Sequence, residues 1–130
     1  MRKRLTSILL ALAMLPFATA SASESVKIGV IYTVAGLGGA SFNDVIHEGC
    51  QRAEKELGIT YEYVEPSTIA DEETVMDEMC ISGEYALIIC VGNEQKDAVS
   101  TVAANYPDQK FCYIDASVDL PNVANYEGKE

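Results

Sequence analysis

Apolar residues recur along the chain with two periodicities, one typical of strands and one typical of helices. Strand-like apolar runs bounded by polar residues, Gly or Pro occupy residues 26–32, 59–64, 85–91 and 110–115, with a short fifth run at 122–126. Apolar or small residues at helical spacing predict helices over residues 42–57, 71–82 and 92–106. Gly58 directly follows the first of these helices, where glycine is a favoured terminating residue.

This order of elements predicts an α/β fold, with a parallel sheet and helices on both of its faces. In such sheets ligands bind beyond the carboxyl ends of the strands, at the point where the strand order reverses. Three segments are expected at that edge: the Gly-rich loop 35–41, Gly92 with Asn93, and Asp115. The pattern stops just after the fifth strand, although both faces of a parallel sheet are normally covered. We therefore expect a truncated domain.

The first 22 residues have the three parts of a secretory signal peptide. These parts are a cationic start at residues 2–4, an apolar run at 5–17 and small residues at 18–23. Cleavage after Ala20 or after Ala22 fits the pattern equally well. The apolar run is shorter than the roughly 20 residues of a membrane-spanning helix, which argues against a permanent anchor. The prediction is a signal peptide over residues 1–22 and an exported, water-soluble product over residues 23–130.

Charge and composition exclude several classes of function. The 130 residues include 9 Lys and Arg against 20 Asp and Glu, a formal net charge of -11, so nucleic acid is not an expected partner. Hydrophobic residues make up 48% of the chain, too many for a disordered acidic tail. With His47 as its one histidine, the chain has no pattern of a metal site or a catalytic triad, so we expect no enzyme, metal or cofactor. His47 is expected to be exposed or near a helix cap, and the acidic run 71–73 is expected to be a solvated helix start.

Four cysteines follow the predicted signal peptide: Cys50, Cys80, Cys90 and Cys112. In an oxidising compartment an even number permits two disulfides, with three possible pairings. Their spacing lacks the close Cys-x-x-Cys arrangement of metal and redox motifs. Because they lie in apolar runs or on a helix face, we favour free thiols that act as small core residues.

Several residues at the predicted ligand edge have both a functional and a structural interpretation. The glycines at 36, 38 and 39 precede a helix N-terminus, which suits either an anion or a tight turn. Asn43 and Asp44 offer polar contacts and Phe42 offers a flat apolar face, but Ser41 or Asn43 would also cap the helix with Phe42 in the core. Asp115 would accept hydrogen bonds from a sugar diol or a base edge, or else stabilise a turn.

Five stretches together resemble one known family. They are the segment 36–44 (GLGGASFND), Glu48-Gly49 followed by the segment 53–58 (AEKELG), the third-strand run 84–92, the segment 106–115 (YPDQKFCYID) and the segment 121–125 (PNVAN). Their sequence and order are similar to those of the basic membrane protein family of ABC-transporter substrate-binding proteins, whose members bind nucleosides. The resemblance covers essentially all of the predicted mature chain. It implies the first lobe, incomplete here, of a type I periplasmic-binding-protein fold, in which the ligand lies between two lobes.

The resemblance also implies a function and a site. The expected function is the solute-binding component of an ABC importer, periplasmic or otherwise extracytoplasmic, monomeric, partnered by a membrane permease and specific for purine nucleosides. The residues expected to bind the ligand are Gly39, Ser41, Phe42, Asn43, Asp44, Gly92 and Asp115. Three alternatives remain open at this point: a ligand sensor that signals to a membrane receptor, a non-functional fragment, and an exported enzyme with a flavodoxin-like sheet.

Overall fold

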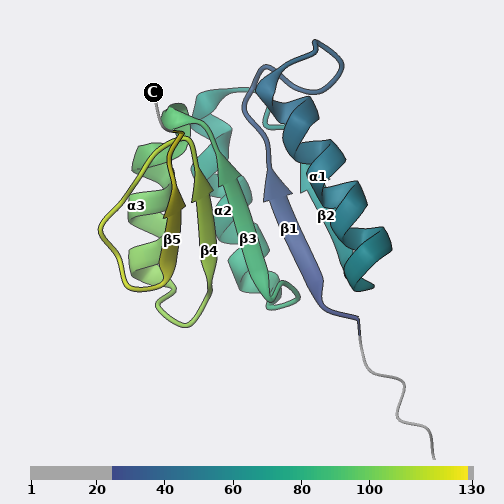
Figure 1. Cartoon of the computed structure of the whole chain (residues 1–130). Coiled ribbons are helices and arrows are strands. Elements are labelled where there is room, and N and C mark those ends of the chain that lie inside the picture. Colours follow the sequence, from purple (N-terminus) through teal and green to yellow (C-terminus); the bar gives the residue numbers. More distant parts are fainter. Residues whose placement is uncertain (1–24, 129–130) are drawn as a thin grey trace, which may run out of the picture.

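Five strands form a single all-parallel sheet in the order β2-β1-β3-β4-β5. The computed structural model describes residues 25–128, so the predicted signal peptide lies outside the described residues. The strands are β1 (Lys27–Ile31), β2 (Thr60–Val64), β3 (Leu87–Val91), β4 (Phe111–Ile114) and β5 (Val123–Tyr126). All five arrows point to the same edge in Figure 1. The strand order reverses between β1 and β3, which is where the ligand rule for such sheets places a site.

Helices cover both faces of the sheet, which confirms the predicted α/β architecture. The helices are α1 (Phe42–Leu57), α2 (Ile69–Ser82) and α3 (Lys96–Asn105), with a short 3-10 turn η1 (Asn93–Gln95) before α3. Figure 1 shows α1 on one side of the sheet and α2 and α3 on the other. Gly58 and Gly83 follow α1 and α2 in the left-handed conformation that ends many helices.

Two helix starts differ from the sequence prediction. The second helix begins at Ile69 rather than at residue 71 because Thr68 is its N-cap, and the Thr68 hydroxyl donates to Asp71 at 2.8 Å. Gly92 does not open the third helix. Its φ of 86° is incompatible with a right-handed helix, and η1 separates it from α3.

The larger part of the core lies between the sheet and the α2–α3 layer. Alternate strand residues point to this face, and the core here includes Ile31, Met76, Ile88, Val99, Val102, Phe111 and Tyr113. The intervening strand residues point toward α1, where a smaller buried cluster contains Val30, Tyr32, Cys50 and Val91. The sheet therefore separates two unequal clusters.

The face that carries α1 is only partly covered. α1 packs beside β2, and an apolar groove next to it is lined by residues of β1, β3 and β4 that include Ile28, Ile89 and Ile114. Cys112 alternates with the buried Phe111 and Tyr113, so it points to this same face and is half-buried. β4 is only half-buried on this side because α1 lies near β2, at the opposite edge of the sheet.

All four cysteines are free thiols. Cys50, Cys80 and Cys90 are buried, which confirms that they act as small core residues. The sheet divides the four by face: Cys80 and Cys90 belong to the larger cluster, whereas Cys50 belongs to the smaller one. Burial raises the pKa of the Cys80 thiol to about 11, so this group stays protonated and unreactive at neutral pH.

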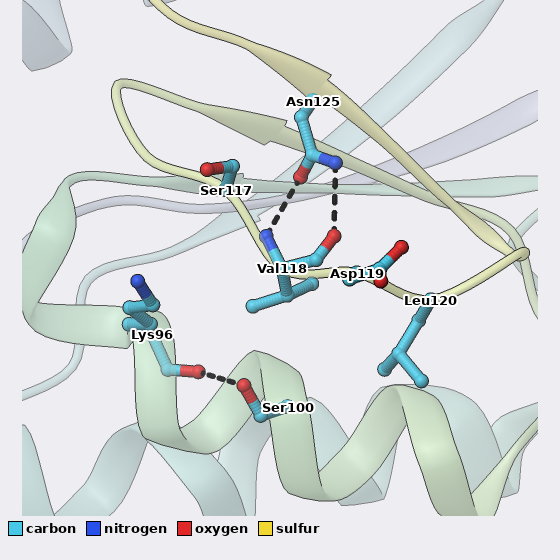
Figure 2. A pocket seen from close by; sticks show the side chains of 7 residues that line it. All are labelled: Lys96, Ser100, Ser117, Val118, Asp119, Leu120 and Asn125. Carbon is cyan, nitrogen blue, oxygen red and sulfur yellow. Dashed lines mark hydrogen bonds between the residues drawn. The ribbon is translucent and has the colours of Figure 1, made fainter.

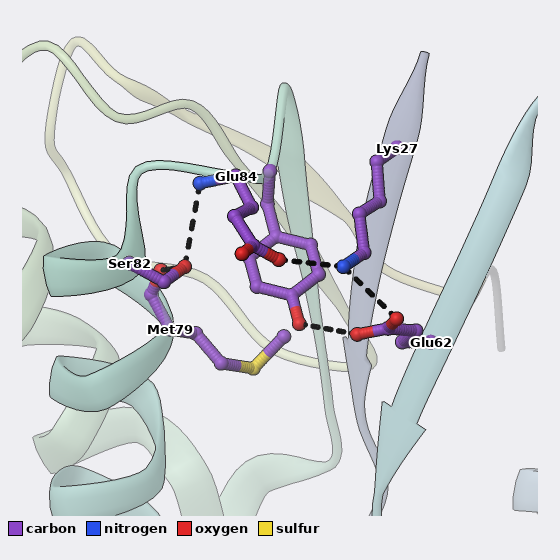
Figure 3. A network of polar contacts seen from close by, with 6 residues as sticks. Lys27, Glu62, Met79, Ser82 and Glu84 are labelled. Atoms are coloured by element: carbon purple, nitrogen blue, oxygen red, sulfur yellow. Dashed lines mark hydrogen bonds and ion pairs between the residues drawn. The ribbon is translucent and has the colours of Figure 1, made fainter. Parts of the chain in front are cut away.

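At the amino edge of the sheet, an exposed network of ion pairs and hydrogen bonds joins β1, β2 and the segment before β3 (Figure 3). The Lys27 ammonium lies 2.9 Å from Glu62 Oε1 and 2.6 Å from Glu84 Oε2. The Tyr85 hydroxyl donates to Glu62 Oε2 at 2.8 Å, and the Lys27 ammonium lies 5.0 Å from the centre of the Tyr85 ring. The hydrogen bond from Lys27 lowers the pKa of the Glu62 carboxyl, with Tyr85 adding to the effect.

Candidate functional site

The segments that follow β1, β3 and β4 meet at the carboxyl edge of the sheet. The loop after β1 (residues 33–41, hereafter the β1 loop) approaches the turn after β3, because the β1 and β3 strands are direct neighbours. Asp115 follows β4, the next strand across. The structure therefore brings the sequence-predicted site residues to one edge, around the point at which the strand order reverses.

Asn43 holds the β1 loop in place from the first turn of α1. Only 1% of its surface is exposed. Its Oδ1 accepts the Thr33 N–H at 3.2 Å, and its Nδ2 donates to Thr33 Oγ1 at 3.0 Å and to the Gly36 carbonyl at 2.9 Å. These bonds occupy the donors and acceptor of the amide, so in this conformation Asn43 positions the loop.

Asp44 acts on the same loop through its carboxylate. Its two oxygens accept the Gly38 N–H and the Ser41 N–H, each at 2.7 Å. These backbone hydrogen bonds lower the pKa of the Asp44 carboxyl, that from Gly38 contributing most. Ser41 is the N-cap residue of α1. Asp44 and Ser41 together join the loop to the helix start.

Phe42 and Gly39 remain accessible at the tip of this arrangement. The Phe42 side chain is 47% exposed, so it is not part of the core. Gly39 is exposed, and a side chain at this position would meet open space. An apolar ring beside an open stretch of backbone is able to accept a flat ligand.

Gly92 is required by the close approach of the β1 loop. Its φ is +86°, and an added Cβ would lie 2.7 Å from Thr33 Cγ2. Its N–H donates to the Ile114 carbonyl at 2.9 Å, and its carbonyl accepts the Tyr113 hydroxyl at 3.0 Å. Gly92 thus joins the ends of β1, β3 and β4.

Gln95 is a site-supporting residue that the sequence prediction missed. It is fully buried, and its Nε2 donates to the carbonyls of Ile31 at 3.1 Å and Tyr32 at 2.9 Å. Its Oε1 accepts the Val91 N–H at 3.1 Å. The signal that would have found it is its spacing, three residues before Ala98 on the buried stripe of α3.

Asp115 has a different environment from Asn43 and Asp44. It is exposed and has a φ of +72°, which is uncommon for a residue with a side chain. Its backbone N–H donates to the Tyr126 carbonyl at 2.8 Å. Within residues 25–128 its carboxylate makes no hydrogen bond or ion pair, so both oxygens are able to accept from a ligand.

Two expectations about the exposure of polar side chains are wrong. His47 is not an exposed imidazole: it is half-buried, its Nδ1 lies 3.0 Å from the Tyr32 hydroxyl, and its ring packs edge-on against Tyr61 and Tyr63. Glu72 is not solvated, because only 1% of its surface is exposed. Glu72 lies four residues before Met76, so it is on the buried face of α2, and that spacing was the available signal.

A second hollow lies between α3 and the segment that joins β4 to β5 (Figure 2). It is lined by Lys96, Ser100, Ser117, Val118, Asp119, Leu120 and Asn125. Several of its polar groups are already hydrogen-bonded. The Ser100 hydroxyl donates to the Lys96 carbonyl at 2.8 Å, and the Asn125 amide accepts the Val118 N–H and donates to the Val118 carbonyl. The Lys96 ammonium and the Asp119 carboxylate in this lining make no hydrogen bond or ion pair within residues 25–128.

Within residues 25–128, three or more His, Cys, Asp or Glu side chains are nowhere grouped as metal ligands. The helices of this part of the chain are all too short or too polar to span a membrane.

Comparison with known proteins identifies the family. A family model described as "ABC transporter substrate-binding protein PnrA-like" matches residues 25–130. An uncharacterized lipoprotein of Pyrococcus abyssi is 37% identical over 99 residues, which cover 76% of this chain and 24% of that protein. The chain spans about a quarter of the length of the curated Pyrococcus relatives that it matches.

Solved structures agree with this assignment. An ABC transporter system solute-binding protein from Aeropyrum pernix K1 superposes with a TM-score of 0.75 at 38% identity, over 78% of this chain and 28% of that one. A lipoprotein fragment from Peptoclostridium difficile 630 gives a TM-score of 0.71 at 26% identity, over 78% of this chain and 84% of that one. The chain belongs to the PnrA-like family of ABC-transporter substrate-binding proteins.

Proposed function

We propose that the carboxyl edge of this sheet is one wall of a nucleoside site in the solute-binding component of an ABC importer. The observation that carries the proposal is the family match over residues 25–130. Purine nucleosides are the proposed ligands, the permease of the importer is the proposed partner, and the protein acts as a non-enzymatic monomer. Residues 1–22 act as the signal peptide, and residues 23–130 form part of the first lobe.

The residues at this edge divide into two roles. Phe42 and Asp115 are exposed and contact the ligand directly, whereas Asn43, Asp44 and Ser41 keep the β1 loop in position. The ends of β1 and β4 are two strand spacings apart, roughly 10 Å, a span that a nucleoside is able to bridge. The Phe42 ring stacks on the base, and the Asp115 carboxylate accepts hydrogen bonds from ribose hydroxyls.

The charge of this edge favours a nucleoside over a nucleotide. Besides Asp115, the carboxylates of Asp44, Glu65 and Glu94 all lie here, since each accepts a hydrogen bond from a backbone N–H of the β1 loop. Within residues 25–128 none of these four carboxylates is in an ion pair. A phosphate group would meet this negative field, whereas an uncharged sugar and base would not.

The location of the protein follows from the same reasoning. The Pyrococcus relatives are named lipoproteins, and substrate-binding proteins of ABC importers act outside the cytoplasm. The predicted signal peptide supports export to the periplasm or another extracytoplasmic compartment. Because the chain contributes one wall of a two-lobed site, we expect the 130-residue chain to bind nucleosides weakly.

Nuclear magnetic resonance of the 15N-labelled chain tests the proposal, because it detects weak binding. Millimolar adenosine or guanosine is expected to shift amide signals of the β1 loop and of the segments at Gly92 and Asp115, whereas amino acids are not. Asp115→Asn should weaken the response about tenfold through loss of a charged acceptor, and the exposed control Asp119→Asn should not. Shifts caused only by sugars or amino acids, or by none of these compounds, would contradict the proposal.

A further inference from the structure

Glu72 is a buried acid without an obvious role in the fold. It lies in the first turn of α2 with 1% of its surface exposed, whereas its neighbours Asp71 and Glu73 are exposed. Within residues 25–128 its Oε1 finds no hydrogen-bond donor. A buried carboxylate without a donor or a cation is costly, so this group requires a proton or a counter-ion.

The group that faces Glu72 is another acid. η1 lies in contact with α2, and its Glu94 carboxyl is close enough to Glu72 to raise the pKa of the Glu72 carboxyl. Cys90 of β3 and Tyr113 of β4 also lie close enough for the charge on Glu72 to raise the pKa of each. Burial and Glu94 are the influences on the carboxyl itself, and neither supplies a positive charge. Two carboxyl groups in such contact hold one proton between them.

Glu94 connects this pair to the candidate ligand site. Its Oε1 accepts the Val34 N–H at 2.9 Å, and Val34 belongs to the β1 loop. The residue after Glu94 is Gln95, whose buried amide fixes the ends of β1 and β3. Glu94 therefore lies between the buried carboxyl of α2 and the backbone of the loop, to which it is hydrogen-bonded.

We propose that Glu72 and Glu94 share one proton, and that this proton positions the β1 loop. With the proton present, the Glu72 carboxyl donates to the Glu94 carboxylate, which remains in place to accept the Val34 N–H. When the proton is lost, the two carboxylates repel each other, and half-buried Glu94 turns toward solvent because Glu72 has no route out. The Val34 N–H then loses its acceptor, and the loop is released at that point.

The protonation range agrees with this geometry. Burial, followed by the charge and the nearby carboxyl of Glu94, raises the pKa of Glu72 to about 7 from its ordinary value of 4.5. The pair therefore changes state near neutral pH. The inference goes beyond the proposed function and does not depend on it, because every readout below uses the free chain without ligand.

Titration of the 13C- and 15N-labelled chain between pH 4 and 9 tests the proposal. The Glu72 carboxyl carbon should titrate with a midpoint at about pH 7, and the Val34 amide signal should follow with the same midpoint. Glu72→Gln should abolish the Val34 titration, since a neutral amide donates to Glu94 at every pH. Glu73→Gln is the matched control, one residue away and exposed, and should leave the titration unchanged.

Glu94→Gln is a second variant that keeps the inference testable if Glu72→Gln fails to fold. Its amide is able to donate to the ionised Glu72 carboxylate, so the Glu72 midpoint should fall below that of the wild-type chain. A wild-type Glu72 that titrates at its ordinary value of 4.5 would overturn the proposal. A Val34 amide signal that does not titrate with the midpoint of Glu72 would also overturn it. A Glu72 carboxyl signal that shifts with millimolar Ca²⁺ at neutral pH would overturn it too, because a cation would then take the place of the proton.

Discussion

At the carboxyl edge of the sheet, Asn43 and Gln95 make their hydrogen bonds almost completely shielded from water, whereas at the amino edge Lys27 and its acidic partners make theirs in contact with solvent. Both edges use a few polar side chains to join several strands. At the buried edge, a lost side chain leaves backbone groups without a partner. At the exposed edge, water and salt ions replace what is lost.

The buried polar contacts, rather than the exposed ones, therefore determine the shape of the candidate site. The bonds of Gln95 and Asn43 fix the backbone from which Phe42 and the β1 loop extend. The network around Lys27 pairs charges at the far end of the same strands without shaping a site. Substitutions at the two edges should therefore differ in size and in their response to salt and pH.

The largest effect is expected for Gln95→Met, which keeps the volume and removes all the hydrogen bonds. It leaves the Val91 N–H and the carbonyls of Ile31 and Tyr32 buried without partners. The free energy of unfolding should fall by on the order of 3 to 5 kcal/mol, measured by urea denaturation. Gln51→Met, at an exposed position of α1, is the control and should change it by about 0.5 kcal/mol at most. Similar losses at the two sites would remove the distinction between buried and exposed amides.

For Gly92→Ala, the free energy of unfolding should fall by a somewhat smaller amount, about 3 kcal/mol. The substitution has two costs, a strained backbone at positive φ and a close contact with Thr33 Cγ2. Gly38→Ala is the matched control, because its φ of +94° is also unfavourable but its Cβ would meet open space. It should cost only about 1 to 2 kcal/mol. Adding Thr33→Ser removes Cγ2 and keeps the hydroxyl, so the double variant should recover part of the stability. Equal costs at the two glycines would show that the close approach to Thr33 is unimportant.

Asn43→Ala should cost about 2 kcal/mol, because part of the β1 loop is open to water that can replace the lost bonds. The more specific result concerns dynamics. The amides of Thr33 and of the loop glycines should exchange with deuterium faster, while those of β4 should change little beyond the global loss of stability. Hydrogen exchange followed by mass spectrometry measures both. Uniform acceleration across the chain would contradict a local role for Asn43.

The smallest effect is expected for Lys27→Met at the amino edge. The loss of stability should be less than for the three substitutions above and should vanish in about 1 M salt, which screens exposed charges. Since Lys27 lowers the pKa of Glu62, their attraction stabilises the chain above the ordinary carboxyl value of 4.5 and is lost as pH falls through the lowered pKa. Lys27→Met should therefore flatten the acid side of the curve of stability against pH. An undiminished loss in salt would show that this network is not a surface feature.

The fold could be predicted in large part because local signals and topology agreed. α1 has the predicted bounds, since Ser41 and Gly58 are clear start and stop residues. The alternation of strands and helices sufficed for a parallel sheet, and the strand-end rule located the candidate edge. The roles within that edge could not be predicted, because the same Ser-Phe-Asn-Asp segment permits Asn43 either to face a ligand or to turn inward onto Thr33.

The elements, their order and the edge at which their loops gather could be predicted from the sequence, because apolar periodicity and glycine positions act over a few residues. The burial of Gln95 against the ends of β1 and β3, the position of His47 among tyrosines and the burial of Glu72 were not evident from the local pattern. Each of these depends on contacts between segments far apart in the chain. Burial and charge pairing arise from such contacts, and a polar residue on a helix has the same local pattern whether the neighbouring strand is present or absent.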